Sequence, residues 1–218
     1  MIQILMDKSL INSNYQLAIA GNIGAGKTTM TEKLSVFFNM EPIYESVDDN
    51  PYLNDFYQDM NRWSFNLQIF FLHKRFSKQI KLMKMKKGFI QDRSIYEDKE
   101  IFARNLRDLK FMSEKDWITY KSLFEDMVQF IKKPNLIIYL KASTTTLISR
   151  ITNRKRDFEK DISPEYIHSL NIYYDQWISK LPKDKVMVID TNNFNIFKDK
   201  DMFEEIKNNI INKLESQC

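Results

Sequence analysis

The sequence predicts an α/β fold in which a five-stranded parallel β-sheet is flanked by helices. Short apolar segments alternate with longer segments of helical spacing, an order typical of a parallel sheet covered on both faces. The chain also has only four glycines, and three of them, Gly21, Gly24 and Gly26, fall within six residues between the first expected strand and the first expected helix. Glycine concentrated in this way indicates a loop with unusual backbone dihedral angles or a close approach to a ligand.

The individual strands and helices follow from the apolar pattern. Gly88 is expected to end the long helix that starts at Trp63, and Ser113, with Asp116 three residues later, predicts the cap of another helix. The expected strands are 15–20, a segment that ends near Glu45, 89–91, 136–140 and 186–189. The expected helices are 27–38, 51–60, 63–86, 95–105, 113–132, 144–152, 164–180 and 201–214.

The composition favours one soluble domain. We expect residues 1–14 to be an N-terminal extension and 15–218 to form the domain, because 43% hydrophobic and 13% aromatic residues supply a substantial core. A net charge of +4 with interspersed signs does not favour a nucleic-acid partner. The single cysteine, Cys218, excludes a disulfide within one chain, and no apolar run reaches the ~18–20 residues of a membrane span. These features together favour the cytoplasm.

The glycine-rich loop has the sequence of a complete phosphate-binding loop (P-loop). The motif G-x-x-x-x-G-K-[ST] fits without a mismatch, and it lies between an expected strand and an expected helix. Backbone N–H groups of such a loop surround phosphate oxygens, the lysine reaches the β- and γ-phosphates, and the hydroxyl of the last residue ligates Mg²⁺. The sequence therefore predicts binding of ATP and Mg²⁺. The residues are Gly21, Asn22, Ile23, Gly24, Ala25, Gly26, Lys27 and Thr28.

Carboxylates and arginines follow the other strands. Glu45 and the pair Asp92-Arg93 are expected at the carboxyl ends of strands, where ligands of parallel sheets collect. One interpretation is that a carboxylate acts as a general base and that the arginine holds it. The other interpretation is that these residues are charges of surface loops. The basic run from Arg150 to Arg156 either forms an arginine-rich lid over the triphosphate or is a solvated helix end.

One face of the long helix combines an amide, an aromatic ring and a guanidinium. Gln68, Phe71 and Arg75 have the spacing i, i+3 and i+7, so their side chains share a face. Polar groups on such a face need partners, and a planar base that forms hydrogen bonds is one candidate. Ordinary surface placement of Arg75 is the alternative.

Several motifs in one order resemble the deoxynucleoside kinase family, over residues 17–194. They are GNIGAGKTT (which includes Thr29), Glu45, RWSFNLQ, DRS with YEDKEIFARNL, the run RITNRKRDFE, and VIDTNN. Mammalian and insect members have Glu-Pro-Val, whereas this chain has Glu45-Ser46-Val47 and then Asn50-Pro51-Tyr52-Leu53, as in bacterial deoxyadenosine/deoxyguanosine kinases. The resemblance implies a P-loop kinase fold with an arginine-rich lid and a homodimer.

The resemblance also implies roles for individual residues. Glu45 is the expected general base for the 5′-hydroxyl, Arg93 positions base and hydroxyl, and Asp92 joins Thr28 near the magnesium. Tyr57 and Glu159 are expected to hold the sugar 3′-hydroxyl. Gln68 is expected to bind the edge of the base, with Phe71, Arg75 and Asp98 nearby and Phe102 stacking on it. The expected lid residues are Arg150, Arg154 and Arg156, and the expected border of the ATP adenine is Asp190 to Phe194.

The predicted activity is ATP-dependent phosphorylation of the 5′-hydroxyl of a deoxynucleoside, with deoxyadenosine or deoxyguanosine as the expected substrate. Two alternatives stay open. A thymidylate-kinase-like enzyme shares a P-loop, an Asp-Arg motif and an arginine lid, but its anionic acceptor would be repelled by Glu45. A catalytically silent P-loop subunit of a heteromeric kinase needs neither Glu45 nor Arg93.

Overall fold

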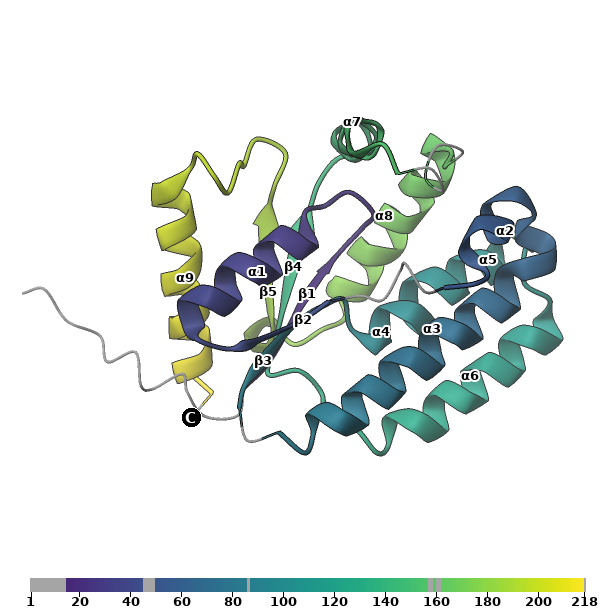
Figure 1. Cartoon of the computed structure of the whole chain (residues 1–218), viewed down its shortest axis with the longest axis horizontal. Coiled ribbons are helices and arrows are strands. Elements are labelled where there is room, and N and C mark those ends of the chain that lie inside the picture. Colours follow the sequence, from purple (N-terminus) through teal and green to yellow (C-terminus); the bar gives the residue numbers. More distant parts are fainter. Residues whose placement is uncertain (1–14, 45–49, 86, 157–158, 160–161, 218) are drawn as a thin grey trace, which may run out of the picture.

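The computed structural model describes residues 15–44, 50–85, 87–156, 159 and 162–217. Its centre is a five-stranded sheet of order β2-β3-β1-β4-β5, and every pair of neighbouring strands is parallel, so the predicted sheet is confirmed (Figure 1). Ile19 of β1 lies opposite Asp92 of β3 and Ile138 of β4, which brings the ends of these strands to one edge. The strands are β1 (Gln16–Gly21), β2 (Glu41–Ile43), β3 (Phe89–Asp92), β4 (Leu136–Lys141) and β5 (Val186–Asp190).

Helices cover both faces of the sheet. In Figure 1, α1 and α9 lie on one face, α3, α4, α6 and α8 lie on the other, and α7 lies beyond the carboxyl ends of the strands. No helix in the described part of the chain is long and apolar enough to cross a membrane. The α-helices are α1 (Lys27–Phe38), α2 (Leu53–Gln58), α3 (Met60–Leu82), α4 (Ile95–Glu97), α5 (Arg104–Asp108), α6 (Glu114–Val128), α7 (Thr144–Arg154), α8 (Pro164–Ile178) and α9 (Lys200–Glu215). The structure also contains a π-helix, η2 (Asp98–Ala103), and a 3₁₀-helix, η4 (Lys183–Lys185).

The boundaries of the long helix differ from the expected ones. The carboxylate of Asp59 accepts a hydrogen bond from the backbone N–H of Arg62 at 3.0 Å, so this cap starts α3 at Met60 rather than at Trp63. The helix ends at Leu82, and Gly88 does not terminate it. The cap at Ser113 was predicted correctly, since its hydroxyl accepts the N–H of Asp116 at 3.1 Å.

The expected helix 95–105 is three consecutive segments, α4, η2 and α5, and it extends to Asp108. The π-helix in its middle adds a wider turn, and such turns occur frequently at functional sites. Asp98 and Phe102, two of the predicted site residues, both belong to it. Apolar spacing does not distinguish one π turn from an α turn, so the π-helix could not be predicted from the sequence pattern.

Gly21 has no room for a side chain. Its φ is +154°, and a Cβ atom there would lie 2.9 Å from the carbonyl oxygen of Leu140 in β4. Gly21→Ala is therefore expected to lower the free energy of unfolding by about 2–3 kcal/mol, through a strained backbone and a contact with rigid backbone. Urea unfolding of the purified variant measures the change.

Gly26 provides the matched control for that measurement. Its φ is +91°, but a Cβ atom there would meet no atom within 4 Å. Gly26→Ala is expected to cost only the backbone strain, about 1–2 kcal/mol. Equal destabilisation by the two substitutions would contradict the assigned contact with Leu140.

Candidate active site

The P-loop joins β1 to α1, as expected, and rests against α7. A Cβ atom on Gly24 would lie 3.0 Å from both the Leu147 carbonyl oxygen and the Ile151 side chain, so the loop and α7 are in close contact. Lys27 is buried, and its ammonium donates to the Asn22 carbonyl oxygen at 3.0 Å. The first N–H groups of α1 point into the loop, and together with Lys27 they favour an anion there.

Thr28 and Asp92 meet across the edge of the sheet. The Thr28 hydroxyl donates to Asp92 Oδ2 at 2.6 Å, and the buried Oδ1 of Asp92 has no hydrogen-bond partner among the described residues. Three or more His, Cys, Asp or Glu side chains do not gather around a common point in this part of the chain. Mg²⁺ needs no such cluster, because it is commonly held by one or two carboxylates, water and substrate phosphates. This pair fits such an ion.

Arg93 follows directly in a strained conformation. Its φ is +71°, in the left-handed region that is uncommon for residues other than glycine. Its backbone N–H donates to the Ile19 carbonyl oxygen at 3.0 Å, and its guanidinium lies 4.3 Å from the centre of the Phe102 ring. Strain of this kind is held at functional sites by surrounding contacts. Here it turns the side chain of the buried Arg93 into the site.

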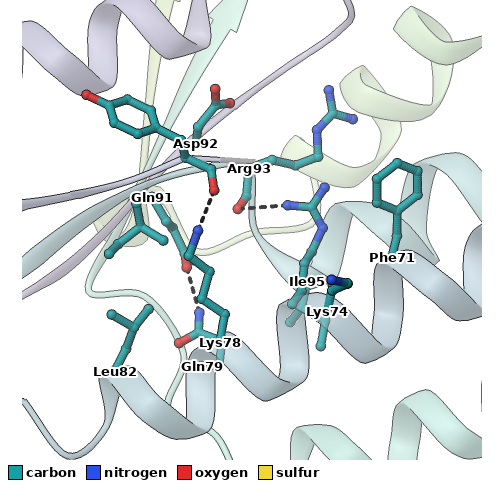
Figure 2. Close-up of a pocket in the computed structure, with 12 residues that line it drawn as sticks. Phe71, Lys74, Lys78, Gln79, Leu82, Gln91, Asp92, Arg93 and Ile95 are labelled. Atoms are coloured by element: carbon teal, nitrogen blue, oxygen red, sulfur yellow. Dashed lines mark hydrogen bonds between the residues drawn. The ribbon is translucent and has the colours of Figure 1, made fainter. Parts of the chain in front are cut away.

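The wall behind Asp92 and Arg93 is formed by α3. Figure 2 shows the amide of Gln79 reaching that of Gln91, which immediately precedes Asp92 in β3. The two amides are buried and are joined by a hydrogen bond of 2.6 Å. One turn earlier in α3, a guanidinium nitrogen of Arg75 lies 3.5 Å from the Arg93 carbonyl oxygen. These contacts tie the long helix to the end of β3.

The far end of the site contains a buried ion pair. Arg75 Nε lies 2.6 Å from Asp98 Oδ2, and their side chains are 12% and 3% exposed. The pair joins α3 to the π-helix η2. Tyr120, which the sequence did not single out, lies close enough to act on it. Burial raises the pKa of the Tyr120 hydroxyl well above its ordinary value, Asp98 raises it further, and Arg75 opposes the shift.

These parts surround a cavity of about 280 Å³, close to the lower end of the range for small-molecule sites, ~300–1,000 Å³. The P-loop side chains lie at one end and Gln68, Phe71 and Asp98 at the other, so one cavity contains both a phosphate-binding and a base-sized polar region. Among the predicted residues, those that line it are Ile23, Gly24, Lys27, Thr28, Tyr57, Gln68, Phe71, Asp92, Arg93, Asp98, Phe102, Arg154, Arg156 and Glu159.

Comparison with known proteins identifies the family. The deoxynucleoside kinase family model matches residues 17–215. The chain belongs to the deoxynucleoside kinase family. It is therefore a phosphotransferase that acts on a deoxynucleoside, and the two alternatives raised by the sequence are not favoured.

Relatives and solved structures agree with this family. The deoxyadenosine/deoxycytidine kinase of Bacillus subtilis is 38% identical over 207 residues, which cover 94% of this chain and 95% of that protein. The deoxyadenosine kinase of Dictyostelium discoideum is 40% identical over 167 residues, 77% of this chain and 68% of that protein. The structure of a deoxyadenosine kinase from M. mycoides with bound dATP superposes with a TM-score of 0.78, at 31% identity, and covers 89% of this chain and 98% of its own.

The three expected lid arginines of this deoxynucleoside kinase have different surroundings. Arg154 and Arg156 line the cavity and pair with Glu159, which is buried; Arg154 Nε donates to its Oε2 at 2.9 Å and Arg156 lies 3.7 Å away. Arg150 instead donates to the hydroxyl of Thr191 at 3.2 Å and to the Thr191 carbonyl oxygen. Burial lowers the pKa of Arg150. Arg150 is thus tied to the segment after β5.

Other predicted residues lie outside the cavity wall. Five residues of the P-loop and the start of α1 do not line the cavity: Gly21, Asn22, Ala25, Gly26 and Thr29. Arg75 contacts the cavity wall through Asp98. Asp190 is the last residue of β5, and Phe194 follows that strand. Glu45 lies outside the described residues; β2 ends at Ile43, two positions before it.

Some lining residues were not predicted. They are Tyr44, Leu53, Phe56, Leu67 and Tyr166. Leu53, Phe56 and Leu67 have the helical spacing of ordinary core residues, and only tertiary packing places them at the cavity. Tyr166 lies on α8, far from the P-loop in sequence, and burial raises the pKa of its hydroxyl. A local pattern contains no signal for such residues.

Proposed function

We propose that this enzyme transfers the γ-phosphoryl group of ATP to the 5′-hydroxyl of a purine deoxynucleoside, deoxyadenosine or deoxyguanosine, in nucleotide salvage. The observation that carries the proposal is the single cavity that joins Lys27 of the P-loop to Gln68 and to Asp98 of the buried ion pair. A deoxynucleoside placed there directs its sugar toward the phosphates and its base toward Gln68. The names of the related deoxyadenosine and deoxyguanosine kinases support the purine class.

The donor site consists of the P-loop and the lid. Residues 21–29 cradle the phosphates of ATP, Lys27 contacts the β- and γ-phosphates, and Arg154 and Arg156 stabilise the charge that develops on the transferred group. Arg150 is the third lid residue, and Asp190 and Phe194 border the adenine. The bonds from Arg150 to Thr191 support this arrangement, because they hold the lid guanidinium beside the segment that contains Asp190 and Phe194.

Mg²⁺ would be held by Thr28 and Asp92 together with phosphate oxygens and water. Oδ1 of Asp92 has no hydrogen-bond partner within the described part of the chain, and Oδ2 accepts the Thr28 hydroxyl; both observations support this assignment. When bound, the ion neutralises charge on the β- and γ-phosphates.

The acceptor site consists of the remaining cavity residues. Glu45 takes the proton of the 5′-hydroxyl. At the same time the 5′-oxygen forms a bond to the γ-phosphorus, and the bond from the γ-phosphorus to the leaving ADP breaks. Arg93 positions Glu45 and the hydroxyl. Tyr57 and Glu159 hold the 3′-hydroxyl, and Phe71 and Phe102 contact the faces of the base. Gln68 binds the edge of the base, and its buried Oε1 has no partner among the described residues.

The proposal is tested by one assay of the purified chain with ATP and Mg²⁺ against the four deoxynucleosides. We expect kcat/KM to be highest for deoxyadenosine or deoxyguanosine, lower for deoxycytidine and lowest for thymidine. Omission of Mg²⁺ should abolish turnover. Thymidine as the best substrate, or a nucleoside monophosphate preferred over every nucleoside, would overturn the proposal.

The Arg75–Asp98 pair is expected to exclude thymine. A charged pair fills the space that the thymine methyl group needs and offers hydrogen bonds to ring nitrogens and exocyclic groups. Replacing both residues, Arg75→Met with Asp98→Ala, should raise kcat/KM for thymidine and lower it for purines by about 10–100-fold each. Gaining or losing a methyl or polar contact in a substrate pocket changes kcat/KM by about this factor. Steady-state kinetics with both substrates measures the change.

Controls separate pocket chemistry from stability. Each single substitution leaves a buried charge without its partner and should destabilise the fold by about 3–5 kcal/mol, so the double variant is the informative one. The exposed pair of Arg107 and Glu114, 2.9 Å apart, is the matched control. Arg107→Met with Glu114→Ala should leave the substrate ranking unchanged; an unaltered ranking in the Arg75/Asp98 double variant would contradict the assigned role.

We also propose a cytoplasmic homodimer. Exposed apolar side chains on and after α6, Ile118 at 60% and Phe130 at 66%, support burial against a second copy. Sedimentation of the purified chain would give the mass of the assembly, and a monomer at all concentrations would contradict this proposal.

A further inference from the structure

Buried side chains hold both backbone polar groups of Gly21, the first residue of the P-loop. The N–H of Gly21 donates to Glu97 Oε1 at 3.3 Å, and the carbonyl oxygen of Gly21 accepts a hydrogen bond from the Tyr174 hydroxyl at 2.8 Å. Glu97 and Tyr174 are both fully buried, and neither lines the cavity. The sequence analysis assigned no role to Glu97 or Tyr174, although Glu97 lies within the motif YEDKEIFARNL.

Glu97 connects the P-loop to the turn that bears Arg93. It lies at the end of α4, and its Oε2 accepts the backbone N–H of Ser94 at 2.7 Å, while the Ser94 hydroxyl lies 3.2 Å away. One carboxylate thus bonds the residue after Arg93 with one oxygen and Gly21 with the other. A displacement of either segment would break bonds that no water reaches.

Tyr174 connects the same point to α8. Its hydroxyl lies 2.8 Å from Glu97 Oε1 as well as from Gly21, so both acceptors share one proton. Burial raises the pKa of this hydroxyl well above its ordinary value, which keeps it a donor. Its ring stacks on Tyr139, 5.5 Å between ring centres, and meets the edge or face of Phe102 at 6.5 Å.

The same helix holds the next residue of the loop. Asn22 donates from Nδ2 to the Ile167 carbonyl oxygen at 2.9 Å and to Asn171 Oδ1 at 2.8 Å. The start of the P-loop is therefore fixed to α8 and to α4 by side chains alone. A fully buried carboxylate and hydroxyl are costly to keep in a protein core unless their bonds are all made.

We infer that Glu97 and Tyr174 are positioning residues, which hold the donor phosphates at a fixed distance and angle from the hydroxyl that Arg93 orients. This inference rests on the proposed function. Phosphoryl transfer depends almost entirely on positioning and charge, and a misplacement of about 1 Å costs on the order of 10²-fold in rate. The contacts to Gly21 transmit the position of the Arg93 turn to the P-loop without touching a substrate.

The test is Tyr174→Phe, which removes only the hydroxyl. We expect kcat to fall about tenfold, because the variant loses a buried hydrogen bond and the loop shifts slightly. The Kd of ATP and the KM of the deoxynucleoside should change less than about twofold. Tyr139→Phe is the matched control, because Tyr139 is in the same stack but its hydroxyl contacts Asp175, at 3.4 Å, instead of the P-loop. It should keep wild-type kcat.

Glu97→Gln and the double variant complete the test. The glutamine nitrogen must face the N–H of Gly21 or of Ser94, so one contact is lost and kcat should again fall about tenfold. The double variant should be no more than about twofold slower than the worse single variant, because both act through one group. Thermal unfolding and titration of ATP-binding sites give the folded fraction.

The outcomes are distinct. A fall in kcat that only follows the folded fraction, a fall equal to that of Tyr139→Phe, or multiplied effects in the double variant would overturn the inference. If the wild-type enzyme phosphorylates no deoxynucleoside, the proposed function fails instead. A selective loss of kcat in active, ATP-binding protein supports the positioning role.

Discussion

Replacing Lys27 with alanine is expected to lower kcat/KM for deoxynucleoside phosphorylation by about 10³-fold or more. Lys27 is buried at the start of α1, and its ammonium lies 3.0 Å from the Asn22 carbonyl oxygen inside the loop. In the proposed donor site it would contribute both to ATP affinity and to stabilisation of charge in the transition state. Steady-state kinetics should show a lower kcat and a higher KM for ATP, and calorimetry should show weaker ATP binding.

Lys33 is the matched control on the same helix. Replacing Lys33 with alanine removes the same charge from α1. The Lys33 ammonium lies 5.2 Å from the centre of the Phe197 ring rather than in the loop. Lys33→Ala should stay within about threefold of wild-type kcat/KM, as expected of a half-buried cation outside the phosphate-binding loop. Near wild-type activity in Lys27→Ala would contradict the assignment of the P-loop as the donor site.

The sequence predicted the fold and the P-loop because their signals are local. Residues 16–38 contain an apolar strand, a glycine-rich turn and a helix within one uninterrupted segment, and the structure forms all three there. The strands β4 and β5 are likewise short, mainly apolar runs. Parallel order then follows from the helices between them, since short connections cannot join parallel neighbours.

Contacts that join distant segments could not be predicted in this way. Gly21 and Glu97 are 76 positions apart, and Gly21 and Tyr174 are 153 apart. In the sequence, Tyr174 is one aromatic residue among many on an apolar helix face, and Glu97 is one acid in a charged stretch. Only the packed structure shows that both side chains are buried against the same glycine.

The turn at Arg93 and the π-helix that follows it also escaped prediction. A residue other than glycine with φ of +71° contradicts local preference, and the surrounding contacts impose it. The π-helix that begins at Asp98 occupies a segment whose apolar spacing also fits an α-helix. Both departures from local preference lie at the cavity, where Arg93, Asp98 and Phe102 converge.

Glu45→Gln is expected to lower kcat by about 10²–10⁴-fold, the usual contribution of a general base. Glu45 lies outside the described residues, but it follows β2, whose carboxyl end is at the same edge of the sheet as Asp92. Glutamine keeps the size and an acceptor oxygen and cannot take the proton of the 5′-hydroxyl. The Kd of ATP, measured without the deoxynucleoside, should change less than about twofold, because the donor site lacks this residue.

The control is Glu41→Gln, a substitution of the same kind in β2, four positions earlier and paired in register with Phe89 of β3. It should keep kcat within about threefold of the wild-type value. Unchanged turnover in Glu45→Gln would remove Glu45 from the mechanism and return the search for the base to Asp92, another carboxylate at this edge of the sheet.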